Sequence, residues 1–143
     1  MTADTQAPAS PSAHTVIIYS DDPGIRDRMR TAVGRRPARD VRVEYLEAAT
    51  SAEVMALVEE NDVDLLLLDG EAWPAGGLGI ARQLRDELED SPTTCVVLAR
   101  AADRWLAAWS GADAVLVHPL DPVRTAETVA DLLRGRTLAP SSR

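Results

Sequence analysis

The sequence predicts an α/β domain built on a doubly wound, five-stranded parallel sheet, and three observations lead to this fold class. Short runs rich in Val, Ile and Leu alternate five times with segments of helical periodicity, the pattern of parallel strands joined by right-handed crossover helices. One run, Val63–Leu68, is apolar almost throughout, as expected of a central strand buried on both faces. The length of 143 residues suits one domain and is too short for two.

The first half of the predicted domain contains two strand–helix units. Thr15–Tyr19 is a short apolar run rich in β-branched residues and predicts the first strand. Asp22-Pro23-Gly24 predicts the start of a helix that continues to Val33, because Asp caps helices and Pro is favoured in their first turn. Apolar and polar residues alternate in Val41–Tyr45, which predicts a strand exposed on one face. The sequence Thr50-Ser51-Ala52-Glu53 is a capping box and predicts the second helix.

The second half repeats the pattern three times. The run Val63–Leu68 ends in Asp69 and precedes a Gly-rich loop, and Asp103 is expected to cap a short fourth helix that ends at Trp109. The remaining expected elements are two strands and two helices, namely Cys95–Leu98, Ala114–Val117, Ile80–Leu88 and Val123–Leu133. Five such units favour the flavodoxin-like strand order 2-1-3-4-5. The predicted domain covers residues 14–134, between a disordered N-terminal tail, 1–13, and a flexible C-terminal tail, 135–143.

Composition narrows the possible functions. The chain carries 15 basic residues, every one of them Arg, against 23 acidic residues, and its net charge of −8 argues against binding nucleic acid or anionic lipid. No apolar run is long enough to insert into a membrane, and the N-terminus lacks the features of a signal peptide. Cys95 is the single cysteine, so no disulfide can form within the chain. A cytoplasmic location is therefore expected.

Polar side chains gather where two neighbouring strands of the predicted sheet end. Ser20, Asp21 and Asp22 follow the first strand, and Asp69 follows the third. These strands flank the switch point at which such sheets bind ligands. Carboxylates in a small polar crevice suit Mg²⁺, and an Asp beside Mg²⁺ can accept a phosphoryl group. The alternative is that these residues only cap helices and end strands; capping is favoured for Asp22, and a site role for Asp69.

The region from Thr15 to Arg134 resembles the receiver domain of two-component response regulators, the CheY-like family. The resemblance is carried by the strings YSDDPGIR, VDLLLLDG and GADAVLVHPLDP, in this order and at this spacing. It implies the five-stranded fold already predicted. It also implies that Asp69 occupies the position of the phosphoacceptor.

The same resemblance exposes departures around the acceptor. Receivers have two acidic residues directly after the first strand, and the matching residues here are Ser20 and Asp21. One acidic residue of the metal site is therefore missing, and Asp21 with Asp69 would form only a weak or vestigial Mg²⁺ site. Receivers also have a Pro four residues after the acceptor, whereas Pro74 lies five residues after Asp69. The predicted function requires no cofactor.

Further departures fall on the residues by which receivers switch. The Thr or Ser expected after the fourth strand is Ala99, and the aromatic residue expected on the fifth strand is Val115. The Lys expected before a cis-linked Pro is His118, followed by Pro119. Neutral His supplies no fixed positive charge at pH 7. These degenerate positions predict a receiver that is not controlled by phosphorylation and is not an enzyme.

Three tryptophans suggest a surface for a protein partner. Trp105 and Trp109 are four residues apart and share one face of the short fourth helix. They either cover the edge of the core or anchor a partner, since Trp is enriched at interface hot spots. In receivers the fourth helix, fifth strand and fifth helix form the usual partner face. Trp73, in the loop above the predicted site, is a candidate second contact.

The function expected from these residues is that of a stand-alone, atypical receiver. No output domain is expected after the fifth helix, so the chain would act through contact with another protein. The pattern also resembles orphan receivers of GC-rich bacteria associated with the respiratory NADH–quinone oxidoreductase. That resemblance implies an accessory subunit, held by its complex at the inner face of the plasma membrane. The alternative is a phosphoaccepting single-domain regulator whose partner is a histidine kinase.

Overall fold

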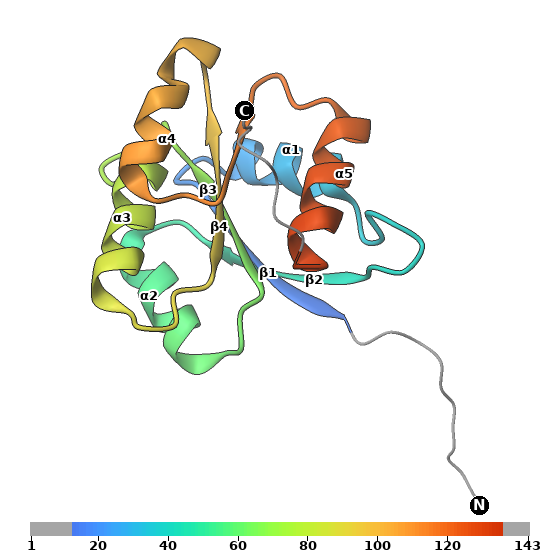
Figure 1. Cartoon of the computed structure of the whole chain (residues 1–143), viewed down its shortest axis with the longest axis horizontal. Helices are drawn as coiled ribbons and strands as arrows, with labels where there is room; N and C mark the ends of the chain where they lie inside the picture. Colours follow the sequence, from blue (N-terminus) through green and yellow to red (C-terminus); the bar gives the residue numbers. More distant parts are fainter. Residues whose placement is uncertain (1–12, 136–143) are drawn as a thin grey trace, which may run out of the picture.

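The structure is a computed structural model that describes residues 13–135. Its five strands are all parallel and lie in the order β2-β1-β3-β4-β5, as predicted (Figure 1). The strands are β1 (His14–Tyr19), β2 (Val43–Ala48), β3 (Leu65–Asp69), β4 (Thr93–Leu98) and β5 (Ala114–Val117). The helices are α1 (Pro23–Val33), α2 (Ser51–Glu60), α3 (Gly77–Glu87), the 3-10 turn η2 (Ala101–Asp103), α4 (Arg104–Ser110) and α5 (Pro122–Leu133). The predicted tails, 1–13 and 135–143, lie outside the described residues except for residues 13 and 135.

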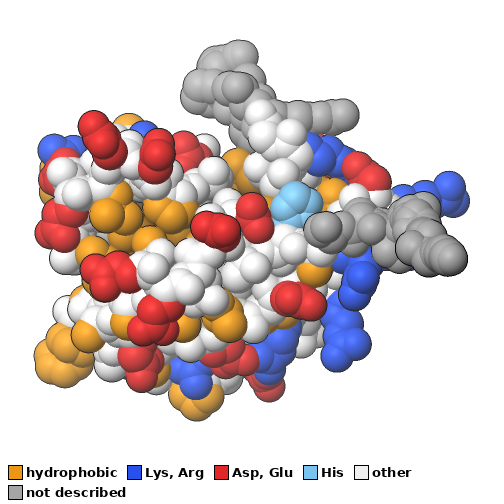
Figure 2. Space-filling view, turned by 90° about the horizontal axis from the view of Figure 1, so that it is seen from below, with side chains coloured by type: hydrophobic (Ala, Val, Ile, Leu, Met, Phe, Trp, Pro, Cys, Tyr) orange, Lys and Arg blue, Asp and Glu red, His pale blue; other side chains and the backbone are white. Residues whose placement is uncertain are grey.

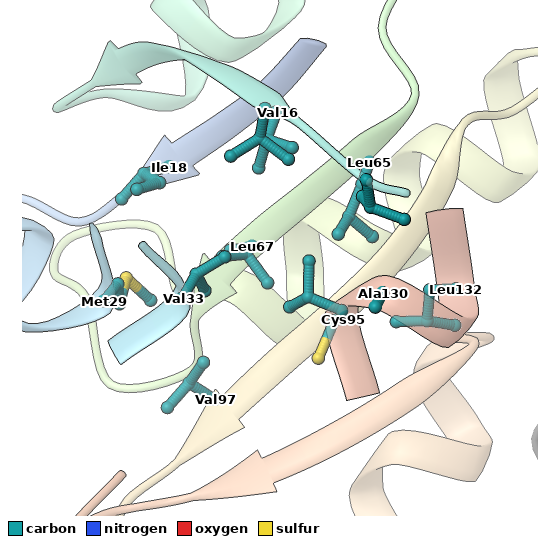
Figure 3. Close-up of a cluster of buried hydrophobic side chains, with 13 residues drawn as sticks. Val16, Ile18, Met29, Val33, Leu65, Leu67, Cys95, Val97, Ala130 and Leu132 are labelled. Carbon is teal, nitrogen blue, oxygen red and sulfur yellow. The ribbon is translucent and has the colours of Figure 1, made fainter. Parts of the chain in front are cut away.

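The helices cover both faces of the sheet. Helices α1 and α5 lie on one face and α2 and α3 on the other, with α4 beside α3 (Figure 1). Alternate strand residues enter separate cores: Leu65 and Leu67 pack with α1 and α5, whereas Leu66 and Leu68 pack with α2 and α3. Figure 3 shows the first core, in which Met29 of α1 approaches Leu67. Each fully buried Leu contributes about 1.5–3 kcal/mol, so β3 anchors the domain.

Four strands have boundaries that differ from the expected ones. Strand β1 begins at His14 instead of Thr15, and β4 begins at Thr93 instead of Cys95. The second strand is not Val41–Tyr45 but begins at Val43, because Val41 closes a turn through a bridge to Ala38. It continues to Ala48 because pairing with β1 extends that far. The third strand likewise begins at Leu65 instead of Val63. Inter-strand pairing, more than local hydrophobicity, sets these ends.

The helix starts follow their predicted caps in two of three cases. The Asp22 carboxylate accepts the Gly24 N–H at 2.8 Å, and the Thr50 hydroxyl accepts the Glu53 N–H at 3.1 Å, as predicted. The prediction for Asp103 is wrong: it precedes α4 but its carboxylate binds the Arg100 guanidinium instead of the helix. The fourth helix is short, as expected. Within residues 13–135, no helix has the length and apolar character needed to cross a membrane.

Candidate functional site

The carboxyl ends of β1 and β3 bring Ser20 and Asp69 into contact. Asp69 is the last residue of β3 and is 4% exposed, and Ser20 follows β1 directly and is fully buried. The strands hold these positions through their ladders: Ser20 N donates to Ala48 O at 3.2 Å, and Gly70 N donates to Val97 O at 2.8 Å. Two rigid neighbouring strands thus fix the centre of the site.

Both carboxylate oxygens of Asp69 are occupied by donors of the chain itself. The Ser20 hydroxyl donates to Oδ2 at 2.7 Å, and the Glu71 N–H donates to Oδ1 at 2.9 Å. The Ser20 oxygen in turn accepts the Asp22 N–H at 3.0 Å. Hydrogen bonds to a carboxylate are stronger than neutral ones, and a buried carboxylate requires them. The position at which the resemblance expects a second metal-binding acid therefore carries the hydroxyl that stabilises Asp69.

The carboxylate of Asp21 is directed to the loop after β3. It is exposed, and its Oδ1 accepts the Trp73 N–H at 3.1 Å. Among residues 13–135 no group of three or more His, Cys, Asp or Glu side chains is placed to hold a metal ion. Oδ2 of Asp69 accepts the Ser20 hydroxyl and Oδ1 of Asp21 accepts the Trp73 N–H. As they stand, these carboxylates do not fit a resident Mg²⁺ ion, which needs oxygen atoms that are free to coordinate it. The weak magnesium site at Asp21 and Asp69 stays a prediction.

Glu71 is a site residue that the sequence reasoning missed. Its N–H caps Asp69, and its side-chain Oε2 accepts the Ala99 N–H at 3.4 Å. Ala99 is exposed and follows β4, so this contact joins the loops after β3 and β4 across the top of the sheet. An acidic residue two positions beyond the strand end was the signal that could have identified it.

The side chains at the positions matched to the receiver switch, Ala99, Val115 and His118, form no hydrogen bond or ion pair with Asp69 in the described part of the chain. Val115 is half-buried on β5, opposite Val96, and packs against the core beneath α2 and α3. The backbone N–H of His118 donates to Leu98 O at 2.9 Å, and the His118–Pro119 bond is cis, as the resemblance implied. The buried Nε2 of His118 has no hydrogen-bond partner in the described part of the chain. No hydrogen bond or ion pair between described residues joins His118 to Asp69.

The Gly-rich loop packs directly on the acceptor position. A Cβ on Gly77 would lie 2.8 Å from the backbone oxygen of Asp69, so any other residue here would force the start of α3 to shift away from β3. The Tyr19 hydroxyl donates to Ala75 O and ties the same loop to β1. Burial, together with the charges of Asp21 and Asp69, raises the pKa of Tyr19 and keeps this hydroxyl protonated as a donor.

The three tryptophans are exposed. Trp73 is 76%, Trp105 69% and Trp109 55% exposed. The Arg82 guanidinium of α3 lies over the Trp109 ring, 5.7 Å from its centre, and donates to Trp109 O at 2.9 Å. The pair on α4 is thus linked to α3, whereas the resemblance pointed to α4, β5 and α5. Trp73 lies in the loop bound by Asp21.

Comparison with solved structures defines the class of fold. A CheY-like receiver protein from Methanospirillum hungatei is similar over 87% of this chain and 96% of its own, with a TM-score of 0.70 and 22% identity. A putative response regulator from Chloroflexus aurantiacus is similar over 86% of this chain and 99% of its own, with a TM-score of 0.74 and 19% identity. A response regulator from Thermotoga maritima, solved in complex with Mg²⁺ and BeF, is similar over 83% of this chain and 98% of its own, with a TM-score of 0.68 and 22% identity. The fold is that of a receiver domain.

Sequence relatives establish the family. Two proteins from two strains of Mycobacterium tuberculosis, each described as an uncharacterized response regulatory protein, are 43% identical to this chain over 129 residues. The match covers 90% of this chain and 97% of each relative. No family model matches the sequence. The chain belongs to the response regulators and carries their CheY-like receiver domain.

Proposed function

We propose that this receiver acts through protein contact and is not controlled by phosphorylation. The observation that carries the proposal is the Ser20 hydroxyl bonded to Asp69 at 2.7 Å. With Glu71 N on the other oxygen, Asp69 is satisfied by the chain itself and is held between two fixed strands. A phosphoryl donor would have to displace a buried hydrogen bond before it could reach a carboxylate oxygen.

Charge around Asp69 also disfavours phosphoryl transfer. Such transfer requires cationic groups that neutralise the moving oxygens. Asp21 and Glu71 bring negative charge to the loops around Asp69, and the chain contains no Lys. The cation nearest in the hydrogen-bond network is Arg26, which donates to the Ser20 carbonyl at 2.7 Å and to Glu47 at 2.9 Å. It supports the backbone of the crevice, and no cation among residues 13–135 is hydrogen-bonded to or ion-paired with Asp69.

The switch that would report a phosphoryl group is absent as well. Ala99 has no hydroxyl, and its N–H is bonded to Glu71. A ligand can shift a conformational equilibrium only through different interactions with the two states. Without a hydroxyl or an aromatic rotamer to rearrange, the loops after β3 and β4 stay in one hydrogen-bonded arrangement.

The surface proposed for the partner is formed by the tryptophans on α4. Trp105 and Trp109 together expose a large aromatic area, and Arg82 flanks it with a positive charge. Exposed aromatic and Arg side chains are the residues most enriched in interface hot spots. Trp73, in the loop beside Asp21, is a second exposed aromatic side chain proposed to contact a partner.

The identity of the partner stays a prediction. The resemblance to orphan receivers implies subunits of a respiratory NADH–quinone oxidoreductase, with the chain as an accessory subunit at the inner face of the membrane. The second candidate is a phosphoaccepting regulator served by a histidine kinase. That candidate is favoured by one observation, the retention of Asp69 at the end of β3.

Affinity purification from the native cells, followed by mass spectrometry, tests the proposal. Wild type and Asp69→Asn should capture the same partner in equal amounts, because phosphorylation is not needed. Trp105→Ala/Trp109→Ala should capture at least about tenfold less of the partner, as expected for two hot-spot residues. The matched control is Glu59→Ala/Glu60→Ala, which truncates two exposed side chains at the end of α2, outside α4 and α5. Loss of capture in Asp69→Asn, or a histidine kinase as the captured protein, contradicts the proposal.

A further inference from the structure

The segment between α1 and β2 concentrates unpaired positive charge in an acidic chain. Four arginines fall within residues 34–42, and all four are exposed: Arg35, Arg36, Arg39 and Arg42. None of their side chains forms a hydrogen bond or ion pair within residues 13–135. By contrast, six other arginines hold carboxylates, namely Arg26, Arg30, Arg82, Arg85, Arg100 and Arg134. The chain has a net charge of −8, yet no acidic residue within 13–135 forms an ion pair with these four arginines.

The backbone that carries these arginines is fixed. Helix α1 ends at Gly34, whose φ of +77° turns the chain, and the Tyr45 hydroxyl donates to Gly34 O. Val43 N donates to Arg35 O at 2.9 Å, which ties the turn to β2. Val41 is 1% exposed and anchors the far end of the segment in the core. Burial raises the pKa of Tyr45 and keeps its hydroxyl a donor. A segment held in this way loses little freedom when it binds.

Three of these four arginines, Arg35, Arg36 and Arg42, line a hollow beside the edge strand β2. It has a volume of about 810 Å³, and its lining includes Arg30, Arg35, Arg36, Arg42, Glu44 and Tyr45. Arg30 is already paired with Glu47 and Asp27, so Arg35, Arg36 and Arg42 supply the free guanidinium groups. Guanidinium groups are weakly hydrated and bind carboxylates with two parallel hydrogen bonds. We propose that this arginine hollow binds an acidic, carboxylate-rich segment of a protein partner.

Size and exposure favour a peptide segment over a small anion. The guanidinium-bearing residues are exposed and spread from the end of α1 to β2, whereas a site for a single oxyanion needs converging buried donors. Nucleic acid has a far higher density of negative charge, and the net charge of −8 repels it. An acidic protein segment carries several neighbouring carboxylates that can bind the arginines. Its total charge is moderate, so the net negative charge of this chain repels it less than it repels nucleic acid.

The hollow is separate from the tryptophan surface. It lies beside β2, at one edge of the sheet, whereas α3 and α4 flank the half of the sheet that contains β3, β4 and β5 (Figure 1). In Figure 2 most of the visible basic side chains gather on one side of the molecule, and acidic side chains spread over the rest of that face. The inference therefore does not rest on the proposed function, and one partner segment can occupy each surface.

Fluorescence anisotropy with a labelled synthetic Glu/Asp-rich peptide tests this inference on the full chain. Arg35→Gln/Arg36→Gln should weaken binding by about tenfold or more, because each lost guanidinium removes a charge-assisted contact. The control Arg104→Gln/Arg124→Gln removes equal charge from two exposed, unpaired arginines elsewhere and should leave affinity within about twofold. The Gln/Asn counterpart of the peptide should not bind, and added salt should weaken binding of the acidic peptide.

Several outcomes would overturn the inference. Equal losses in the two double variants would mean that only total charge matters. Tighter binding of single-stranded DNA or of anionic phospholipid vesicles at the same ionic strength would assign the hollow to another ligand. Competition by inorganic phosphate at concentrations that leave ionic strength unchanged would indicate a small-oxyanion site. Trp105→Ala/Trp109→Ala should bind the peptide normally, so failure here is distinguishable from failure of the proposed function.

Discussion

Replacing Ser20 by Ala is the most informative single perturbation of the crevice. The Ser20 hydroxyl is fully buried, donates to Asp69 Oδ2 at 2.7 Å and accepts the Asp22 N–H at 3.0 Å. Alanine fits the same space, so packing changes little. The substitution leaves one oxygen of a buried carboxylate without its donor and the Asp22 N–H without its acceptor.

The expected cost follows from the kinds of bond that are lost. A hydrogen bond to a charged group contributes about 1.5–3 kcal/mol and a neutral one about 1 kcal/mol, so Ser20→Ala should cost about 2–4 kcal/mol. Ser110 is a matched control because it is also fully buried, but its hydroxyl donates to a neutral carbonyl, Ala107 O, at 2.8 Å and accepts the Ala112 N–H at 3.2 Å. Ser110→Ala should cost only about 1–2 kcal/mol.

Urea unfolding followed by circular dichroism measures the difference. With a denaturant slope of about 1–3 kcal/mol/M, Ser20→Ala should lower the midpoint by roughly 1–2 M, about twice the effect of Ser110→Ala. The slope should be unchanged in both variants. Equal midpoints for the two variants would refute the reasoning, because the charge of Asp69 would then contribute nothing through Ser20.

Three further predictions concern the crevice, the buried cysteine and the start of α3. Ser20→Asp places a second carboxylate against Asp69 and should destabilise the fold in the absence of metal. Millimolar Mg²⁺ should raise the unfolding midpoint of this variant and leave the midpoint of the wild type unchanged. A midpoint of the variant that does not respond to Mg²⁺ contradicts this prediction. Burial raises the pKa of Cys95 to about 12, with Asp113 adding to the effect, so the stability from the protonated thiol is complete below pH 9 and is lost as pH rises toward 12. At pH 8 its thiolate should be about a thousandfold scarcer than that of an ordinary cysteine, and a thiol reagent that modifies the native chain rapidly would contradict this. Gly77→Ala should destabilise the fold by about 1–3 kcal/mol, because the added Cβ would lie 2.8 Å from Asp69 O. The control Gly79→Ala, whose Cβ would have no neighbour within 4 Å, should stabilise α3 by up to about 1 kcal/mol. Thermal unfolding measures both changes, and the opposite order of stability would refute the close approach of Gly77 to Asp69.

The strands and helices could be predicted because each carries its own local signal. The run Leu65–Leu68 is buried on both faces, and burial of that kind requires an apolar sequence. The second strand was misplaced by two residues at its start and three at its end, because pairing with β1 decides where β2 begins and ends. Asp103 was misassigned because a nearby Arg100 competes for its carboxylate.

The crevice was predictable only in part. Ser20 and Asp69 directly follow or end their strands, so topology alone brings them together. The position of Glu71, two residues after β3, was a local signal, but its contact with Ala99 depends on the paths of two separate loops, which no local pattern encodes. The arginine hollow was hidden because a net charge of −8 averages over the whole chain and conceals a local basic cluster. Contacts between separate loops are the information that sequence periodicity lacks.

Intact-mass analysis after incubation with Mg²⁺ and acetyl phosphate tests the central claim most directly. The matched positive control is Ser20→Asp/Ala99→Thr/His118→Lys, which restores the residue types that receivers carry at these positions. The account predicts no adduct on wild type and an acid-stable, base-labile phosphoryl adduct on the triple variant, which disappears when Asp69→Asn is added. A stoichiometric adduct on Asp69 of the wild-type chain would contradict it.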